Sequence, residues 1–252
     1  MSQTDPSRPQ LPLAYEPVAL DNGDGVRSHA VRMAREGAEE GTLVWATRQS
    51  EGRGRPGKDW HSPDEGLYVS LILEPEFARA DFGQIALVGV VSMGLAFAEQ
   101  VVPMTDLAYR WPNDILLSGV KVAGLWLDAD EHNDWLVLSV AVNVGRAPET
   151  VIDAGCVQVE GGNPDITPTS LLENYARHFL HWLNRWAEEG MDPILGQFRN
   201  RHAQPGTAMM VRLDTEEVIA GPLIGLDETG ALQVETGQDQ VRTVTLNEFF
   251  GL

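Results

Sequence analysis

The sequence predicts an α+β protein in which a mostly antiparallel sheet carries helices on one side. Three observations lead to this prediction. Short apolar runs between residues 42 and 144 are separated by tight turns, which favours neighbouring antiparallel strands. Two long stretches, 82–102 and 170–190, have the apolar spacing of helices that pack on a sheet. A series of short strands from residue 208 onward indicates a small β-module at the C-terminal end.

Three parts of the chain follow from this pattern. We expect residues 1–24 to form a flexible lead-in, because they are polar and end in a cluster of turn-forming residues. Residues 25–204 are expected to form the main domain. Residues 205–252 are expected to form a small β-barrel or curled sheet of the size of an SH3 domain.

Composition limits the classes of protein to which the chain can belong. Of its 252 residues 43% are hydrophobic, which is enough to bury a core, and the formal charge of −19 argues against general nucleic-acid binding. We expect no membrane span, because no apolar run reaches the length of a bilayer crossing, and the polar N-terminus is unlike a secretory signal. The single cysteine, Cys156, excludes an internal disulfide. These features predict a cytoplasmic protein that binds neither DNA nor membrane.

The first half of the chain is expected to begin with a helix over Ser28–Glu40, which ends at Gly41. Strands at Thr42–Ala46 and Leu67–Leu73 then enclose a glycine-rich loop. The following helix, Phe82–Val102, is rich in apolar and small residues and is therefore expected to be buried in the core.

The second half is expected to continue with strands joined by a hairpin-like turn at Ser118-Gly119 and with a strand over Trp135–Val144. Ser170 is expected to cap the long amphipathic helix that runs to Gly190. The C-terminal strands are expected at residues 208–213, 217–220, 221–226, 231–234 and 240–246.

The loop from Gln49 to Trp60 holds three glycines, two arginines and a lysine directly after an apolar strand. Glycine lets backbone N–H groups approach a ligand, and arginine grips carboxylate or phosphate with a planar fork. We therefore expect Arg53, Gly54 and Arg55 to surround an anion; the alternative is a solvated basic turn. The glycines also match the dinucleotide fingerprint G-x-G-x-x-G, but that interpretation fails because a strand and not a helix follows the loop.

A second group of polar residues is concentrated around Trp111-Pro112-Asn113-Asp114. The proline restricts the backbone, so the two residues after it should be held rigidly at a strand end. Asp114 is a candidate ligand for Mg²⁺, and a hairpin would bring Lys121 near this acid, with Gly124 just beyond. The alternative is a simple turn followed by an edge-strand lysine.

Taken together, these motifs resemble those of the biotin protein ligases, in order and in approximate spacing. The resemblance rests on Gln49, the loop Gly52–Gly57, Trp111–Asp114, Lys121, Gly124 and Asn143. It extends through the helix at 170–190 to Gly225–Leu232, which is similar to the C-terminal domain of that family.

The resemblance implies a class II synthetase-like catalytic domain over residues 25–204 and an SH3-like domain over 205–252. It implies a monofunctional ligase that joins biotin to AMP from ATP, with Mg²⁺, and passes the biotinyl group to a lysine of a carrier-protein domain. The expected partner is a biotin-acceptor domain, such as that of a biotin-dependent carboxylase. A homodimer is compatible with the resemblance.

The resemblance also assigns roles by position. Lys121, Arg53 and Arg55 would be catalytic, and Asp114 would be the metal ligand. The residues that bind substrate or nucleotide would be Gln49, Arg53, Gly54, Arg55, Trp111, Asn113, Lys121, Gly124 and Asn143.

The chain departs from the family where the biotin ring is expected to bind. Gly25-Val26-Arg27 stands where the family has Ser-Thr-Asn, which removes hydroxyl and amide partners for the ureido group. In the loop, Glu51 replaces a small residue and Lys58 replaces an arginine. The alternatives are therefore a ligase or acyltransferase of the same fold for lipoate or another carboxylic acid, and a non-catalytic binding protein. A pure binder needs no set of phosphate-neutralising residues, which disfavours the last alternative.

Overall fold

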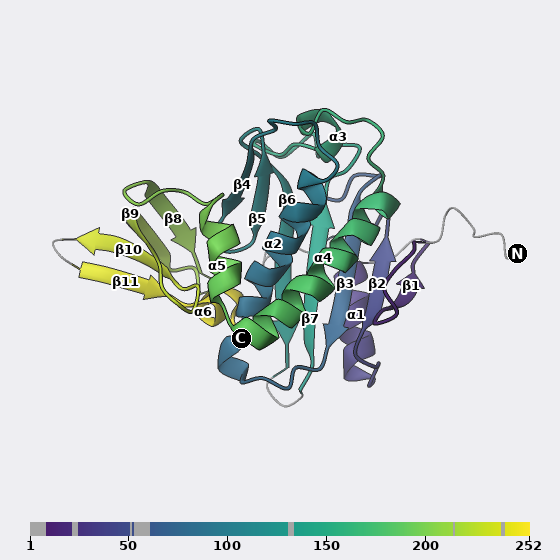
Figure 1. Ribbon diagram of the computed structural model, residues 1–252, viewed down its shortest axis with the longest axis horizontal. Coiled ribbons are helices and arrows are strands. Elements are labelled where there is room, and N and C mark those ends of the chain that lie inside the picture. Colours follow the sequence, from purple (N-terminus) through teal and green to yellow (C-terminus); the bar gives the residue numbers. More distant parts are fainter. Residues whose placement is uncertain are drawn as a thin grey trace, which may run out of the picture.

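The structure, a computed structural model, places one mixed sheet at the centre of the described chain (Figure 1). It describes residues 9–21, 25–50, 52, 61–130, 134–213, 215–237 and 240–252. Within this part, seven strands follow the order β1-β2-β3-β7-β6-β5-β4. Their bounds are β1 Glu16–Ala19, β2 Thr42–Ala46, β3 Leu67–Leu73, β4 Leu107–Arg110, β5 Asp114–Leu117, β6 Val120–Ala129 and β7 Leu136–Val142.

The edge strand β1 lies inside the segment that the sequence predicts to be a flexible lead-in. Its residues Glu16–Ala19 pair in parallel with Thr42–Trp45 of β2, while the other ladders of this sheet are antiparallel. Just before the strand, the hydroxyl of Tyr15 donates to the carbonyl of Ala176, 3.0 Å away. The prediction is wrong for these residues, because four residues are too short to show an alternating pattern in the sequence.

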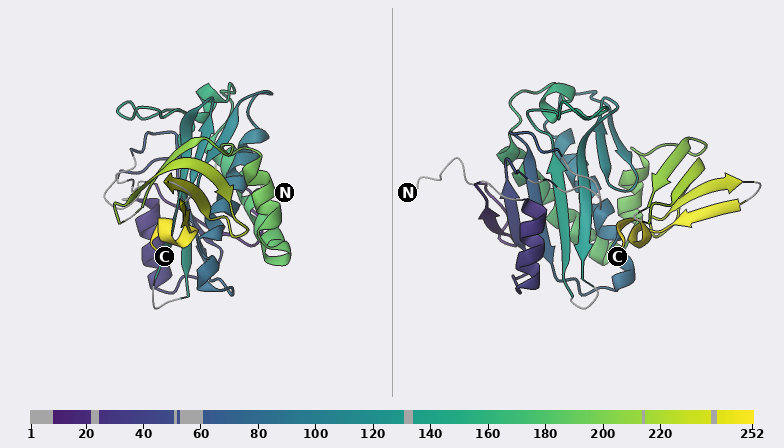
Figure 2. Two further views of the ribbon diagram at one scale, coloured as in Figure 1. Left: turned by 90° about the vertical axis from the view of Figure 1, so that its left-hand side faces the viewer. Right: turned by 180° about the vertical axis from the view of Figure 1, so that it is seen from behind.

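Helices cover both faces of the sheet, whereas the sequence predicts them on one side only. Helix α2 (Gln84–Ala98) packs against α4 (Pro168–Glu189) and α5 (Asp192–Arg199) on one face. Helix α1 (Val26–Arg35) lies on the opposite face, as the view from behind shows (Figure 2). Its buried residues form a separate apolar cluster with the sheet: Val26, Ala30, Ala34, Val44, Ala46, Tyr68, Ile72, Trp135 and Val137.

Helix α2 is the central core helix that the sequence predicts. The stretch Arg79–Ala98, which begins with the 3-10 turn Arg79–Asp81, is long and apolar enough to cross a membrane by those two criteria alone. The expectation that no run reaches this length is therefore wrong. Most of the stretch is buried between the sheet and the helices α4 and α5, so its apolar character is that of a core helix.

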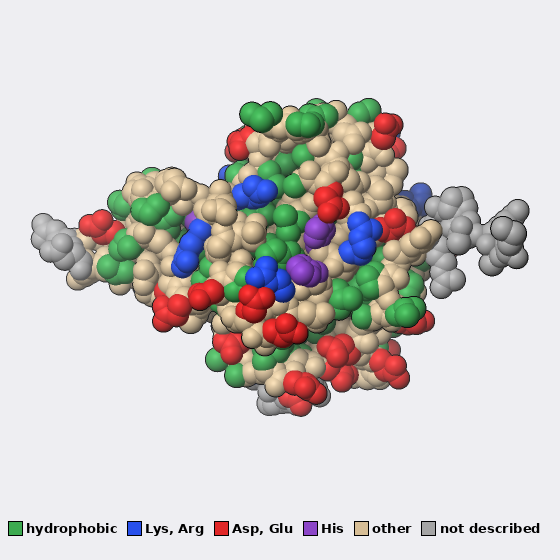
Figure 3. Space-filling view, in the orientation of Figure 1, with side chains coloured by type: hydrophobic (Ala, Val, Ile, Leu, Met, Phe, Trp, Pro, Cys, Tyr) green, Lys and Arg blue, Asp and Glu red, His purple; other side chains and the backbone are tan. Residues whose placement is uncertain are grey.

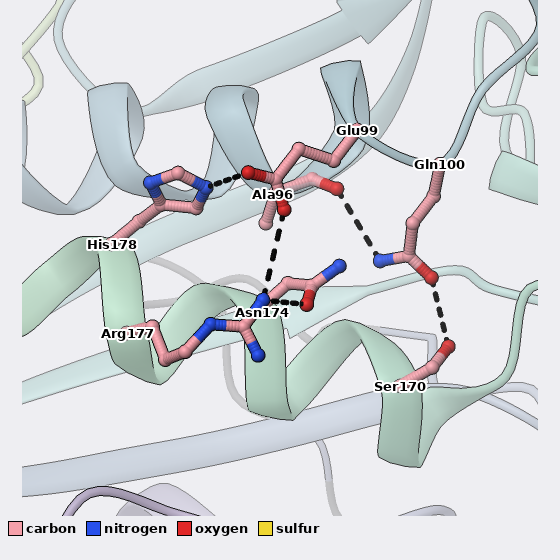
Figure 4. Close-up of polar contacts among 7 residues, drawn as sticks. All are labelled: Ala96, Glu99, Gln100, Ser170, Asn174, Arg177 and His178. Atoms are coloured by element: carbon pink, nitrogen blue, oxygen red, sulfur yellow. Dashed lines mark hydrogen bonds and ion pairs between the residues drawn. The ribbon is translucent and has the colours of Figure 1, made fainter.

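A polar seam joins α2 to α4 along their exposed edges (Figure 4). His178 and Glu99 lie 2.9 Å apart, and the hydroxyl of Ser170 donates to the side chain of Gln100 at 2.8 Å. Ser170 is predicted to be the N-cap of α4, but the cap is Thr167, which forms a capping box with Ser170 three residues later. The short helix α3 (Val157–Glu160) precedes this segment.

The C-terminal module is an antiparallel sheet of four strands within the described residues, ordered β11-β10-β9-β8. The predicted strands 217–220 and 221–226 are one continuous strand. The remaining bounds are β8 Ala208–Arg212, β9 Val218–Leu226, β10 Leu232–Gly237, β11 Gln240–Val244 and α6 Leu246–Phe250. Helix α6 turns back onto the main sheet, where the ring of Phe249 contacts those of Trp111 and Trp126.

Candidate functional site

A cavity of about 640 Å³ opens on the α1 side of the main sheet. Strands β3, β6 and β7 form its floor, and the first turn of α1 forms one wall. Strand β8 of the small sheet and the loop 148–154 border it as well. The described residues predicted to bind substrate, nucleotide or metal all line it: Gln49, Trp111, Asn113, Asp114, Lys121, Gly124 and Asn143.

The hairpin β5–β6 brings Lys121 to Asp114, as the sequence predicts. Ser118 and Gly119 make the two-residue turn, both with positive φ, at 51° and 84°. The ammonium nitrogen Nζ of Lys121 lies 2.5 Å from Oδ1 of Asp114, and both side chains are partly buried. Arg110 is 4.0 Å from Oδ2 of the same carboxylate, so two cations face one acid.

Trp111 and Asn113 hold the start of this hairpin in place. The indole N–H of Trp111, which is buried, donates to the carbonyl of Gly230, in the turn between β9 and β10, at 2.9 Å. The peptide bond between Trp111 and Pro112 is cis. The amide of Asn113 donates to the carbonyl of Leu125 at 2.7 Å, and the backbone N–H of Leu125 donates back to the carbonyl of Asn113 at 2.9 Å. Both residues therefore shape the cavity wall as well as line it.

Gln49 fastens the first turn of α1 to the cavity. Its side-chain oxygen accepts from the backbone N–H of Val26 at 3.0 Å, and its amide nitrogen donates to the hydroxyl of Ser62 at 2.9 Å. The amide thus satisfies a helix N–H that has no partner inside the helix.

Arg27 belongs to the segment that stands where the family has Ser-Thr-Asn, and Asp128 neutralises its charge. Its guanidinium makes two hydrogen bonds to Asp128, at 2.6 and 2.7 Å, and lies over the ring of Trp126, 5.2 Å from the centroid. Such a bidentate pair is rigid as well as charge-compensated. Sequence reasoning missed Asp128, which is distant in the chain and carries no motif.

Asn143 directly follows β7 and is 2% exposed. Its amide nitrogen donates to the carbonyl of Gly155 at 3.0 Å, whereas its side-chain oxygen has no partner among the described residues. A buried acceptor without a donor is rare and costly, and here it lines a cavity. Gly124 lies beside it on the floor, in register with Ala141 and Asp114.

The predicted anion-binding residues Arg53, Gly54 and Arg55 lie outside the described residues, so their roles stay predictions. Gly52 is described and is buried. No group of three or more metal-ligating side chains occurs within the described part of the chain. Asp114 presents a carboxylate to the cavity.

Comparison with known proteins decides the family. The model of the biotin/lipoate A/B protein ligase family matches residues 58–200. The chain belongs to this family. A biotin–[acetyl-CoA-carboxylase] ligase of Paracoccus denitrificans is 30% identical over 223 residues, which make up 84% of this chain and 91% of that protein. The family expected from the motifs is thereby confirmed.

Two further members of the biotin/lipoate ligase family extend this result. A bifunctional ligase/repressor of Bacillus subtilis is 27% identical over 217 residues, 83% of this chain and 66% of that protein. The structure of biotin protein ligase from Aquifex aeolicus in complex with biotin and ATP has a TM-score of 0.77 and 26% identity, over 92% of this chain and 97% of that chain. The expected fold, with a mixed sheet, helices and a small C-terminal β-module, is confirmed by this match.

Proposed function

We propose that the protein is an ATP-dependent ligase that activates biotin as biotinyl-AMP and transfers the biotinyl group to a lysine of a carrier-protein domain. Family membership and the similarity to biotin ligases support this function. The single observation that carries it within this chain is the pair Lys121–Asp114, 2.5 Å apart at the wall of a cavity large enough for a small acid.

The first half-reaction brings two anions together. A carboxylate oxygen of biotin attacks the α-phosphorus of ATP, and the bond from that phosphorus to the pyrophosphate oxygen breaks. Lys121 would neutralise charge on the carboxylate and the phosphate, and its effect is greatest where negative charge grows in the transition state. Asp114 would hold the ammonium group in that position, so that little reorganisation is needed during the reaction.

Mg²⁺ fits this site as an ion shared with the nucleotide. Mg²⁺ is commonly held by one or two carboxylates together with substrate phosphates, and Asp114 offers one carboxylate facing the cavity. When bound, the ion would neutralise phosphate charge. Asp114 is therefore our proposed protein ligand for it.

Asn143 supplies a contact suited to the nucleotide. Its unpartnered, buried oxygen requires a hydrogen-bond donor, and the adenine amino group and the ribose hydroxyls of ATP are donors. In the second half-reaction, the amine of the acceptor lysine attacks the carbonyl carbon of biotinyl-AMP, loses a proton, and AMP leaves. Arg53, Gly54 and Arg55 are proposed to cover the acyl-adenylate between the two steps.

We also propose that the enzyme acts in the cytoplasm without binding DNA and that it pairs as a homodimer. The formal charge of −19 disfavours a polyanion partner, and acidic side chains crowd the lower part of the face in Figure 3. The free, buried thiol of Cys156 suits a reducing compartment. Strand β1 is a sheet edge at which a second copy would pair. Sedimentation velocity of the protein alone tests for the homodimer, and the same measurement with duplex DNA added tests for DNA binding.

The substrate is tested by pyrophosphate exchange into ATP with biotin, lipoate or octanoate as the acid. We expect exchange with biotin, followed by transfer to a purified biotin-carrier domain that is seen as a mass increase on one lysine. Lipoate is the second candidate, because Gly25-Val26 lacks the hydroxyl partners expected for a ureido group. Exchange with lipoate alone would move the assignment to a lipoate ligase of the same family, and binding without exchange would indicate a non-catalytic protein.

A further inference from the structure

Two buried hydroxyl groups form a polar spot on the floor of the cavity. Ser70 of β3 and Ser139 of β7 are register partners in the antiparallel ladder, and both line the cavity. Their side-chain oxygens lie 2.8 Å apart, and the residues are 1% and 8% exposed. The neighbouring side chains on this face of the sheet are apolar or small, including Val137 and Ala141 on β7.

The serine pair has hydrogen-bonding capacity that the protein leaves unused. Each hydroxyl has one hydrogen and two acceptor lone pairs, and the bond between the two consumes one hydrogen and one lone pair. Within the described residues, neither side chain makes another hydrogen bond. One O–H and several lone pairs therefore remain, and both residues border the cavity.

The pair lies at the end of the cavity opposite Lys121. Ser139 is in register with Trp126, and from Lys121 to Trp126 the strand β6 rises roughly 16 Å. The lysine side chain takes up part of this distance. An acid whose carboxylate meets Lys121 therefore carries its far end toward Ser139 and Ser70, and Trp126 and Tyr68 also line the cavity.

Three other polar groups at this end are already engaged. The N–H of Val26 donates to Gln49, the amide of Gln49 donates to Ser62, and Arg27 is held by Asp128. The serine pair is therefore the polar contact with spare capacity on the sheet floor at this end, within the described residues, and the hydroxyl of Ser28 lies on the α1 wall.

We propose that Ser70 and Ser139 together recognise the ureido group of biotin and so select biotin over lipoate, an inference that rests on the proposed ligase function. The free O–H donates to the ureido oxygen, and a lone pair accepts from a ureido N–H. The ring of lipoate offers only two sulfur atoms, which are weak acceptors and carry no hydrogen to donate. This pair takes over contacts that Gly25-Val26-Arg27 does not supply.

The test compares Ser70→Ala, Ser139→Ala and the double variant with the unchanged protein. Pyrophosphate exchange and calorimetric titration are measured with biotin and with lipoate. A hydrogen bond to the substrate that is made equally in the ground state and in the transition state affects binding alone, so its loss raises KM and leaves kcat unchanged. We expect each single variant to raise the KM and the Kd for biotin about tenfold, and to lower the biotin-to-lipoate ratio of kcat/KM by the same factor.

A matched control is Ser92→Ala, which removes a buried hydroxyl in α2 that, among the described residues, bonds only to the carbonyl of Val88 and is not among those that line the cavity. It should leave the KM for biotin unchanged. If biotin supports exchange but the serine variants keep the biotin-to-lipoate ratio, the serine pair is structural and this inference falls while the ligase function stands. If no acid supports exchange in the unchanged protein, both fall.

Discussion

The ammonium group of Lys121 lies 2.5 Å from the carboxylate of Asp114, across a two-residue hairpin, and both side chains border the cavity. This contact holds a cation in place where an acid and a nucleotide phosphate would meet. A lysine without such a partner would have to give up rotamer freedom in each reaction cycle. The pair therefore places the charge before the substrates arrive.

We predict that Lys121→Ala lowers the rate of pyrophosphate exchange by roughly 10²- to 10³-fold, since it removes a cation that stabilises the transition state. Steady-state exchange with the preferred acid measures this effect. The matched control is Arg110→Ala, which removes the more distant cation, 4.0 Å from Asp114 and largely exposed. It should cost less than tenfold. Equal losses in the two variants would mean that Lys121 has no special role.

A second prediction concerns the loop from Gln49 to Trp60, most of which lies outside the described residues. The sequence of this loop combines glycines with cationic side chains that can bind an anion, so we expect backbone amides of Gly52–Lys58 to become protected when an acyl-adenylate binds. Hydrogen exchange with and without a non-hydrolysable biotinyl-AMP analogue measures this. The strand β3 serves as the internal reference, because its residues are buried inside the sheet. Unchanged protection over the loop would exclude a lid.

His202 gives a prediction about stability and pH. Burial lowers the pKa of His202 below its ordinary value, opposed by the hydrogen bond that the ring donates to the carbonyl of Tyr109 at 3.1 Å. The folded protein thus keeps the ring neutral where the unfolded chain binds a proton. Stability from this residue is present above the unfolded pKa of about 6.5 and is lost as the pH falls through and below that value.

We therefore expect the free energy of unfolding to fall more steeply between pH 7.5 and 5.5 in the unchanged protein than in His202→Gln, which cannot titrate. Urea denaturation at several pH values measures both slopes. His178→Gln is the control, because His178 is not buried and lies 2.9 Å from Glu99 on the surface of α4. Parallel curves for the unchanged protein and His202→Gln would show that His202 does not drive the loss of stability in acid.

Local chemistry explains which parts of this fold and site could be predicted from sequence. The turn at Ser118-Gly119 is recognisable because a Ser-Gly pair marks turns and Gly119 accepts positive φ, and it places Lys121 beside Asp114 within a few residues of chain. The long helices are recognisable from their apolar spacing. These features depend on neighbours in the sequence.

Features that depend on distant pairing could not be predicted. The position of α1 on the opposite face of the sheet is invisible, since its apolar stripe identifies a buried side but not which face it covers. The bond between Ser70 and Ser139 joins two strands far apart in the chain, and each serine alone is unremarkable in an apolar strand. The unpartnered oxygen of Asn143 likewise appears only once Gly155 is placed against it.

The last prediction concerns Arg27 and Ser28, which begin α1 beside the cavity. Arg27 is neutralised by Asp128 and lies against Trp126, so its removal leaves a partly buried carboxylate unpaired and loosens that ring. We expect Arg27→Ala to weaken biotin binding about tenfold, and Asp128→Asn combined with Arg27→Met to restore part of it.

Ser28 is exposed at the cavity, and Ser28→Ala should change the Kd for biotin by less than threefold. Calorimetric titration of these variants with biotin shows which of the two residues, Arg27 or Ser28, contributes to biotin binding. Sub-micromolar binding that survives Arg27→Ala but is lost in Ser28→Ala would identify Ser28 as the hydroxyl that an ordinary biotin ligase uses, and would remove Arg27 and Asp128 from the acid pocket.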